Sequence, residues 1–182
     1  MLAAVVGIGI CGVAAGIGAF RGILSSTPTI RLSDVVAVGE ATIVYDKEGN
    51  EIDQYVSTNS NRLSVGMDEI PDYLGKAFVA IEDQRFYQHN GIDVKGILRA
   101  GYQFLKTGGE EAQGASTITQ QLLKNTVFTD WTSEGNNKIK KIKRKIQEQY
   151  LALEITKYYS KDEILLRYMN AINLGQNTLG VE

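Results

Sequence analysis

The sequence predicts a mainly α-helical protein that begins with a long apolar helix and contains one small β-hairpin. Residues 2–20 form a run of nineteen positions without a charged side chain. After residue 70, apolar residues recur at helical spacing, and only residues 41–56 alternate in the manner of paired strands. With 182 residues, of which 43% are hydrophobic, the chain can bury one core of ordinary size. A fully disordered chain and a polytopic membrane protein are therefore excluded.

Composition excludes several kinds of site. The chain has one cysteine, Cys11, and one histidine, His89, so a disulfide framework and a metal site with several Cys or His ligands are ruled out. A net charge of −2 argues against a nucleic-acid partner. Charge is nevertheless uneven, because residues 34–83 hold 3 basic and 11 acidic side chains, whereas residues 84–182 hold 14 basic and 10 acidic ones. We therefore look for a site in the cationic second half.

The apolar segment 2–20 is long enough to cross a bilayer, since about 20 helical residues span a hydrocarbon core of about 30 Å. It contains five glycines, which membrane helices tolerate better than soluble helices do. The alternative is a cleaved signal peptide, whose apolar region is usually only about 7–15 residues long. We predict a membrane anchor over residues 1–24 of a single-pass protein. The flanking Arg21 and Arg31 do not establish its orientation.

A stalk and β-hairpin linker is expected over residues 25–60. The cluster Asp46-Lys47-Glu48-Gly49-Asn50 is rich in turn-forming residues, and strand-like apolar residues flank it on both sides. These two features together predict a hairpin of two short strands.

The remaining domain, residues 61–182, is expected to be helical throughout. Asp, Ser and Thr mark helix starts because their side chains accept hydrogen bonds from free backbone N–H groups of the first turn. Asp93 precedes one segment, which ends at Gly108, and Ser160 with Glu163 has the pattern of a capping box. The predicted helices are 73–87 after Asp72, the segment from Asp93 to Gly108, the segment from Ser116 or Thr117 to Asn125, a long basic helix through 139–153, and a helix after Ser160.

The first candidate catalytic group lies in residues 82–91, EDQRFYQHNG. Glu82 follows the apolar run 77–81, and a carboxylate beside such a run is expected to be partly desolvated. Desolvation raises the pKa of a carboxyl group and suits a general acid or base. The alternative is an ordinary helix end in which Glu82 pairs with Arg85. His89 taken alone is better explained as a structural hydrogen-bonding residue.

The second group is the segment 114–125, GASTITQQLLKN. Small residues precede a helix start that is rich in hydroxyl and amide side chains, and free backbone N–H groups at such a start suit an anion or a sugar. Ordinary N-capping explains the same residues without a ligand, so this segment alone leaves both interpretations open.

The third group is a cationic helix, in which six of the eight residues 138–145 are basic. Lys140, Arg144 and Glu148 are spaced i, i+4 and i+8, so they share one face, away from the isoleucines of the same helix. We expect these isoleucines and Leu153 to form the buried stripe. Cations on one line can clamp a diphosphate and hold a carboxylate ionised. The alternative is a solvated face of i,i+4 ion pairs.

In combination these motifs are specific. The chain contains ED-x-x-F-x-x-H-x-G, G-x-STITQQ-x-x-KN, RK-x-x-E and KDEIL-x-x-Y-x-N in this order between Glu82 and Asn170. The set resembles the peptidoglycan glycosyltransferase family, which is the membrane-anchored polymerase module of class A, bifunctional penicillin-binding proteins. A fifth family motif would begin near 175–181, so the resemblance implies a domain that is truncated at its C-terminus.

The resemblance implies a mainly α, lysozyme-like glycosyltransferase domain on the extracytoplasmic face of the cell membrane. Its implied activity is polymerisation of lipid II into β(1→4) glycan strands by inversion, with release of undecaprenyl pyrophosphate. The implied partners are lipid II, the growing glycan strand, membrane lipid and a downstream transpeptidase domain. No S-x-x-K nucleophile of a transpeptidase occurs in this chain. The resemblance establishes no required cofactor, and Glu148 is a candidate ligand for Mg²⁺ or Mn²⁺.

The matching motifs also imply roles for individual residues. Glu82 would be the general base that deprotonates the attacking sugar hydroxyl, and Glu148 would be a second essential carboxylate facing it across a cleft. The implied substrate-binding residues are Asp83, Phe86, His89, Arg99, Ser116, Thr117, Gln120, Gln121, Lys124, Lys140, Arg144 and Lys145.

Two alternatives remain open from the sequence. A lytic, glycan-cleaving enzyme of lysozyme-like fold would use one acidic Glu, but its substrate carries no pyrophosphate and would not need clustered cations. A non-catalytic module would bind a pyrophosphate lipid without turning it over.

Overall fold

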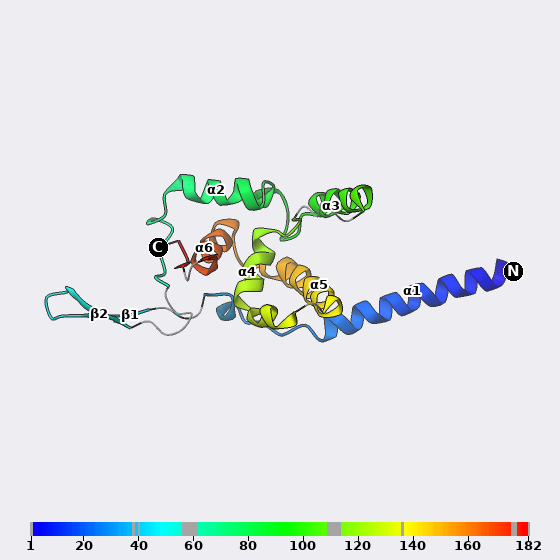
Figure 1. The fold of residues 1–182 in the computed structure, drawn as a ribbon, viewed down its shortest axis with the longest axis horizontal. Helices are drawn as coiled ribbons and strands as arrows, with labels where there is room; N and C mark the ends of the chain where they lie inside the picture. The colour runs from blue at the N-terminus through cyan, green and yellow to red at the C-terminus, as the bar shows by residue number, and fades with distance from the viewer. Residues whose placement is uncertain are drawn as a thin grey trace.

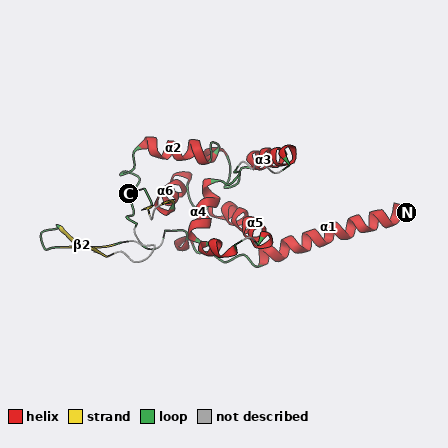
Figure 2. Cartoon of the chain, in the orientation of Figure 1, coloured by secondary structure: helices red, strands yellow, loops and turns green. Residues whose placement is uncertain are grey.

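The structure is a computed structural model that describes residues 2–37, 39, 41–55, 62–108, 114–135, 137–175 and 178–181; for residues 2–10, 131, 132 and 134 it describes the backbone alone. The described chain is mainly helical, as predicted, and two short hairpins supply its strands (Figures 1 and 2). The N-terminal half contains α1 (Leu2–Ser25), η1 (Leu32–Asp34), β1 (Thr42–Tyr45), β2 (Glu51–Tyr55), α2 (Asp72–Glu82) and the short 3₁₀ helix η2 (Phe86–Gln88). The C-terminal half contains α3 (Val94–Thr107), α4 (Ile118–Thr126), η3 (Thr129–Glu134), α5 (Lys138–Ile155), α6 (Lys161–Ala171), β3 (Asn173–Gly175) and β4 (Thr178–Leu179).

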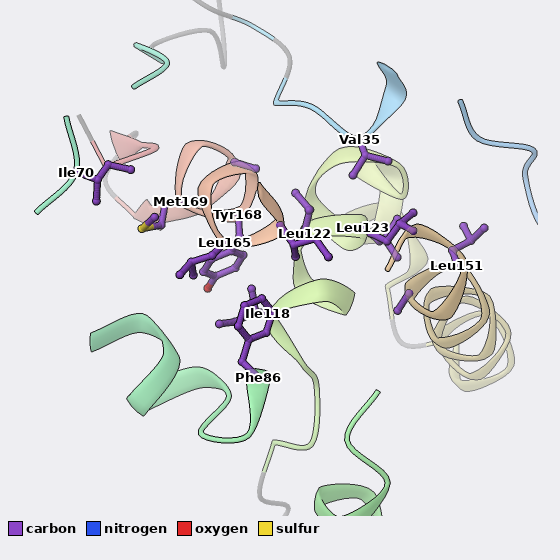
Figure 3. Close-up of a cluster of buried hydrophobic side chains, with 14 residues drawn as sticks. Val35, Ile70, Phe86, Ile118, Leu122, Leu123, Leu151, Leu165, Tyr168 and Met169 are labelled. Atoms are coloured by element: carbon purple, nitrogen blue, oxygen red, sulfur yellow. The ribbon is translucent and has the colours of Figure 1, made fainter. Parts of the chain in front are cut away.

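Helix α4 lies at the centre of the domain and packs against α5 and α6 (Figure 1). Leu122 and Leu123 of α4 are fully buried, and Tyr168 of α6 is buried beside them (Figure 3). The stalk contributes to this core through Val35, which is also fully buried. Because α4 carries both core residues and the STITQQ motif, the core fixes the position of the motif.

The predicted hairpin is present. Strands β1 and β2 pair antiparallel, and the carboxylate of Asp46 accepts hydrogen bonds from the backbone N–H groups of Glu48 and Asn50 at 2.8 and 2.9 Å. The hairpin projects away from the helices (Figure 1). The second hairpin, β3 and β4, was not expected from the sequence.

Three of the predicted helix starts are confirmed. Asp93 caps α3 by accepting from the N–H of Gly96 at 3.0 Å, and Gly108 ends α3 with a φ of 64°, where glycine is favoured. Thr117 caps α4, and Ser160 forms the predicted capping box with Glu163.

Two expectations about helices are wrong. The helix predicted over 73–87 ends at Glu82, because the backbone of Asp83 leaves the helical region with a φ of −158°. The residue that caps its start is Pro71, without a side-chain hydrogen bond, and Asp72 is already helical. Glu82 is therefore the last helical residue, next to an irregular turn.

The expected buried stripe of α5 is wrong for Ile139, Ile142 and Leu153, whereas Ile146 is half-buried. Ile139 and Ile142 are 80% and 60% exposed, and Leu153 is exposed as well. The buried residues of α5 begin only at Gln147 and include Glu148, because the N-terminal half of the helix extends beyond the core. The face turned toward the domain thus carries Gln147 and Glu148 together with the apolar Leu151, Ala152 and Ile155.

Helix α1 forms over the predicted apolar segment and extends away from the domain (Figure 1). Its last turn contacts α5, where the side-chain amide of Gln147 donates to the carbonyl of Ile23 and to the hydroxyl of Ser26, both at 3.3 Å. Among the residues that the structure describes, we find no helix with both the length and the apolarity needed to cross a membrane.

Candidate active site

A cavity of about 520 Å³ lies where the C-terminal end of α2 meets α3, α4 and α5. All three sequence motifs that we singled out contribute to its wall. The lining residues are Ile81, Glu82, Asp83, Gln84, Arg85, Asp93, Gly96, Arg99, Gly114, Ala115, Ser116, Thr117, Gln120, Gln121, Lys124, Lys145 and Glu148. The cavity therefore brings both candidate carboxylates, Glu82 and Glu148, into one site.

Glu82 stands at the end of α2 with its side chain exposed. One carboxylate oxygen accepts a hydrogen bond from the side-chain amide of Gln121 at 2.8 Å. The expected desolvation is wrong, because the apolar run before Glu82 does not cover it, and the adjacent Ile81 is itself 80% exposed. The exposed carboxylate is accessible to a ligand in the cavity.

Arg85 does not form the ion pair with Glu82 that was the alternative prediction, because it pairs with Asp93 instead. The guanidinium of Arg85 binds the carboxylate of Asp93, with Nε 3.2 and 3.1 Å from its two oxygens. This contact, with its side-chain hydrogen bond as the main cause, holds the pKa of Asp93 below its usual value. The pair joins the turn after α2 to the start of α3 and lines the cavity. Sequence reasoning missed it, since the partners are eight positions apart and no local spacing rule links them.

Asp83 fastens the same turn to α4. It is only 6% exposed. Both of its oxygens lie 3.0 Å from Nε2 of His89, and Oδ2 accepts from the backbone N–H of Ile118 at 3.1 Å.

Phe86 is fully buried, with the ammonium of Lys161 4.3 Å from its ring centroid. Phe86 and His89 do not line the cavity, so the structure gives them contacts that hold the motif, in line with the structural interpretation of His89.

The start of α4 is only partly free to bind an anion. The N–H of Ile118 is bonded to Asp83, and the N–H of Gln120 is bonded to the hydroxyl of Thr117 at 3.2 Å. Thr117 also donates to the carbonyl of Gly91 at 2.6 Å. The capping interpretation is therefore confirmed for Thr117. The side chains of α4 on the cavity wall, rather than its free N–H groups, are what this helix offers a ligand.

Glu148 is fully buried and its carboxylate is bound by two cations. Nη1 of Arg144 contacts one oxygen, and Nζ of Lys145 lies 3.0 Å from the other. Lys145 also donates to the hydroxyl of Ser116 at 2.7 Å, which connects α5 to the segment before α4. Glu148 thus orients Lys145 at the cavity wall and holds Arg144 behind it.

Of the predicted face of Lys140, Arg144 and Glu148, only Glu148 lines the cavity. Lys145 lines it, whereas Lys140 is exposed and neither Lys140 nor Arg144 belongs to the wall. Lys124 of α4 lies on the wall, and its pKa is lowered by burial and then by the positive charge of Arg144. Like charges held close together in this way are suited to an anionic ligand.

A divalent cation does not fit these residues. Both oxygens of Glu148 are already engaged by cationic side chains. Within the described residues, no group of three or more His, Cys, Asp or Glu side chains is placed to hold a metal ion. We therefore assign Glu148 no metal and derive no step through one.

One cavity of this helical domain thus combines an exposed carboxylate with clustered cations on its wall. The family model for transglycosylases matches residues 48–182. The chain belongs to this family, the glycosyltransferase family of class A penicillin-binding proteins.

The individual relatives agree with this assignment. The chain is 44% identical to penicillin-binding protein 1A of Clostridium perfringens over 87% of its length, and 42% identical to that of Clostridium botulinum over 95%. It is 38% identical to penicillin-binding protein 1A/1B of Bacillus subtilis over 94% of its length. The chain spans about a fifth of the length of these relatives, with shares of 22%, 20% and 18%.

Proposed function

We propose that the chain polymerises lipid II into β(1→4) glycan strands, with Glu82 as general base. The observation that carries this proposal is the shared cavity: an exposed carboxylate lies on one part of its wall, and Arg99, Lys124 and Lys145 lie on the rest. A hydroxyl nucleophile and a pyrophosphate leaving group require these two kinds of side chain.

The reaction is a single displacement at the anomeric carbon of the donor. The 4-hydroxyl oxygen of the acceptor sugar bonds to this carbon, and its proton passes to the carboxylate of Glu82. The bond from the anomeric carbon to the pyrophosphate oxygen breaks, and its electron pair leaves with undecaprenyl pyrophosphate. Attack from the face opposite the leaving group inverts the configuration and gives a β linkage from an α-linked donor.

The cations act on the leaving group. A pyrophosphate gains negative charge as the bond breaks, and fixed positive charges stabilise that charge in the transition state. Lys145 is held in place by Glu148 and Ser116, so its ammonium requires little reorganisation during the reaction. A lytic enzyme would have no use for this group, because glycan contains no pyrophosphate.

Product stoichiometry tests this proposal. We expect the protein, incubated with labelled lipid II in detergent, to release one undecaprenyl pyrophosphate for each glycosidic bond formed. Preformed glycan strands should not become shorter. Bound lipid II that is never converted would support a binding module, and shortened strands would support the lytic alternative.

We also propose that α1 anchors the protein in the cell membrane, with the domain on the extracytoplasmic face and a transpeptidase domain downstream. The uncharged run 2–20 supports the anchor. Apolar residues of α3 support a domain held at the lipid surface, since Leu98 and Leu105 are 69% and 82% exposed. In Figure 1, α3 lies at the end of the domain from which α1 projects. Because both substrates carry lipid chains, the site must stay close to the bilayer.

Two charges in α1 should release the protein from membranes. Nothing lies within 4 Å of a Cβ atom added at Gly12 or Gly16, so Gly12→Asp with Gly16→Asp causes no clash. Each charge costs about 2.5–3.5 kcal/mol in the middle of a membrane helix. We expect the double variant to be extracted by alkaline carbonate, whereas the wild type and the Gly12→Ala, Gly16→Ala control stay in the pellet. Extraction of the wild type would refute the anchor.

A further inference from the structure

A chain of two hydrogen bonds leads from the core to the exposed carboxylate of Glu82. The amide nitrogen of Gln121 donates to Glu82 at 2.8 Å. On the other side of the same amide, the hydroxyl of Tyr168 lies 3.3 Å from the carbonyl oxygen of Gln121. Tyr168, Gln121 and Glu82 come from α6, α4 and α2, so the chain crosses three elements of the fold.

From these contacts we infer that Tyr168 is a positioning residue, which fixes the amide of Gln121 and through it the carboxylate of Glu82. The inference rests on the proposed function of Glu82 as the base. Tyr168 does not line the cavity and does not touch the proposed substrate site; its effect on the reaction passes through Gln121.

The direction of the hydrogen bonds follows from the charges. A carboxylate can only accept, so the NH₂ group of Gln121 must face Glu82 and its carbonyl oxygen must face Tyr168. The phenol then donates to that oxygen. Burial, followed by the negative charge of Glu82, raises the pKa of Tyr168, which keeps its proton in place. An amide held at both ends cannot turn its carbonyl oxygen toward the carboxylate.

Tyr168 is itself firmly placed. Its side chain is fully buried, and its ring packs edge-on against Phe78 with centroids 5.7 Å apart. An exposed glutamate at a helix end has many accessible rotamers, and a catalytic base must be held in one geometry. The core supplies that geometry through Tyr168, which holds the amide of Gln121 that binds Glu82.

The variant Tyr168→Phe tests the inference, because it removes the hydroxyl and keeps the ring. The hydroxyl-to-amide distance is long for an O–H···O hydrogen bond, so we expect a moderate effect. With lipid II as substrate, kcat should fall about three- to tenfold while KM stays the same. A matched control is Tyr159→Phe, which removes a phenol hydroxyl that donates to the carbonyl of Leu32 at 2.6 Å, and it should leave kcat unchanged.

A double-mutant cycle separates positioning from general stabilisation of the core. If Tyr168 acts through Gln121, then Tyr168→Phe should cost nothing further once Gln121→Ala is present. Equal losses of kcat in both backgrounds would overturn the inference, as would a wild-type kcat in Tyr168→Phe. Each of these outcomes compares the kcat of a variant with that of an active wild type. A wild-type protein that forms no glycan would instead refute the proposed function.

A second readout needs no catalysis. The side-chain NH₂ of Gln121 can be observed by NMR and assigned through its loss in Gln121→Ala. In Tyr168→Phe, its protons should exchange with water faster than in the wild type, and in Tyr159→Phe they should not. Unchanged exchange in Tyr168→Phe would overturn the inference even in an inactive preparation.

Discussion

Glu82→Gln should abolish glycan polymerisation while lipid II still binds. A glutamine amide cannot take the proton of the attacking hydroxyl, and loss of a general base typically costs a factor of about 100 to 10,000 in rate. The fold should persist, since the new side-chain oxygen can still accept the hydrogen bond that Gln121 donates to Glu82. Turnover of labelled lipid II and its binding affinity, measured on the same preparation, check both halves of this expectation.

The matched control is Glu51→Gln on β2, which removes another exposed carboxylate that is not part of the cavity wall. It should retain wild-type turnover. If Glu82→Gln also polymerised lipid II within about threefold of the wild type, a general base worth at least a factor of 100 would have to be another group.

Glu148→Gln should destabilise the whole domain as well as inactivate it. The carboxylate is fully buried and holds two cations, Arg144 and Lys145. Removing its charge weakens two charge-assisted hydrogen bonds and leaves the cations without their buried counter-charge. We expect the free energy of unfolding to fall by about 3 kcal/mol. Urea denaturation followed by circular dichroism measures this change.

Helix α5 offers a control for this variant. Glu154 pairs with Lys157 at 2.6 Å, but the pair is exposed to solvent, and such pairs contribute about 0–1 kcal/mol. Glu154→Gln should therefore leave the unfolding free energy nearly unchanged. Equal effects of Glu148→Gln and Glu154→Gln would show that burial of Glu148 contributes little.

Much of the fold was predictable because its signals are local. Caps at Asp93, Thr117 and Ser160 depend on residues three positions apart, and each forms as expected. The turn at Asp46 is equally local. The burial of a side chain is not a local property, because it depends on where the helices and strands that pack against it lie. Ile139 and Ile142 of α5 have helical spacing, but they are 80% and 60% exposed, and the buried residues of α5 begin only at Gln147.

The residues that form the site were predictable from the sequence, but the contacts between them were not. Motif order placed Glu82, Gln121, Lys124 and Glu148 in one site, and the structure gathers them around one cavity. The pairing of Arg85 with Asp93 and the contact of Tyr168 with Gln121 join residues from separate elements. No spacing rule within a single helix or turn could have found them.

The most direct test of the account is the linkage of the product that the protein makes from lipid II. We predict long glycan strands that a muramidase specific for β(1→4) bonds degrades to disaccharide units, with no strands formed by Glu82→Gln. A product that resists this muramidase, or equal strand formation by Glu82→Gln, would contradict the account of an inverting polymerase with Glu82 as its base.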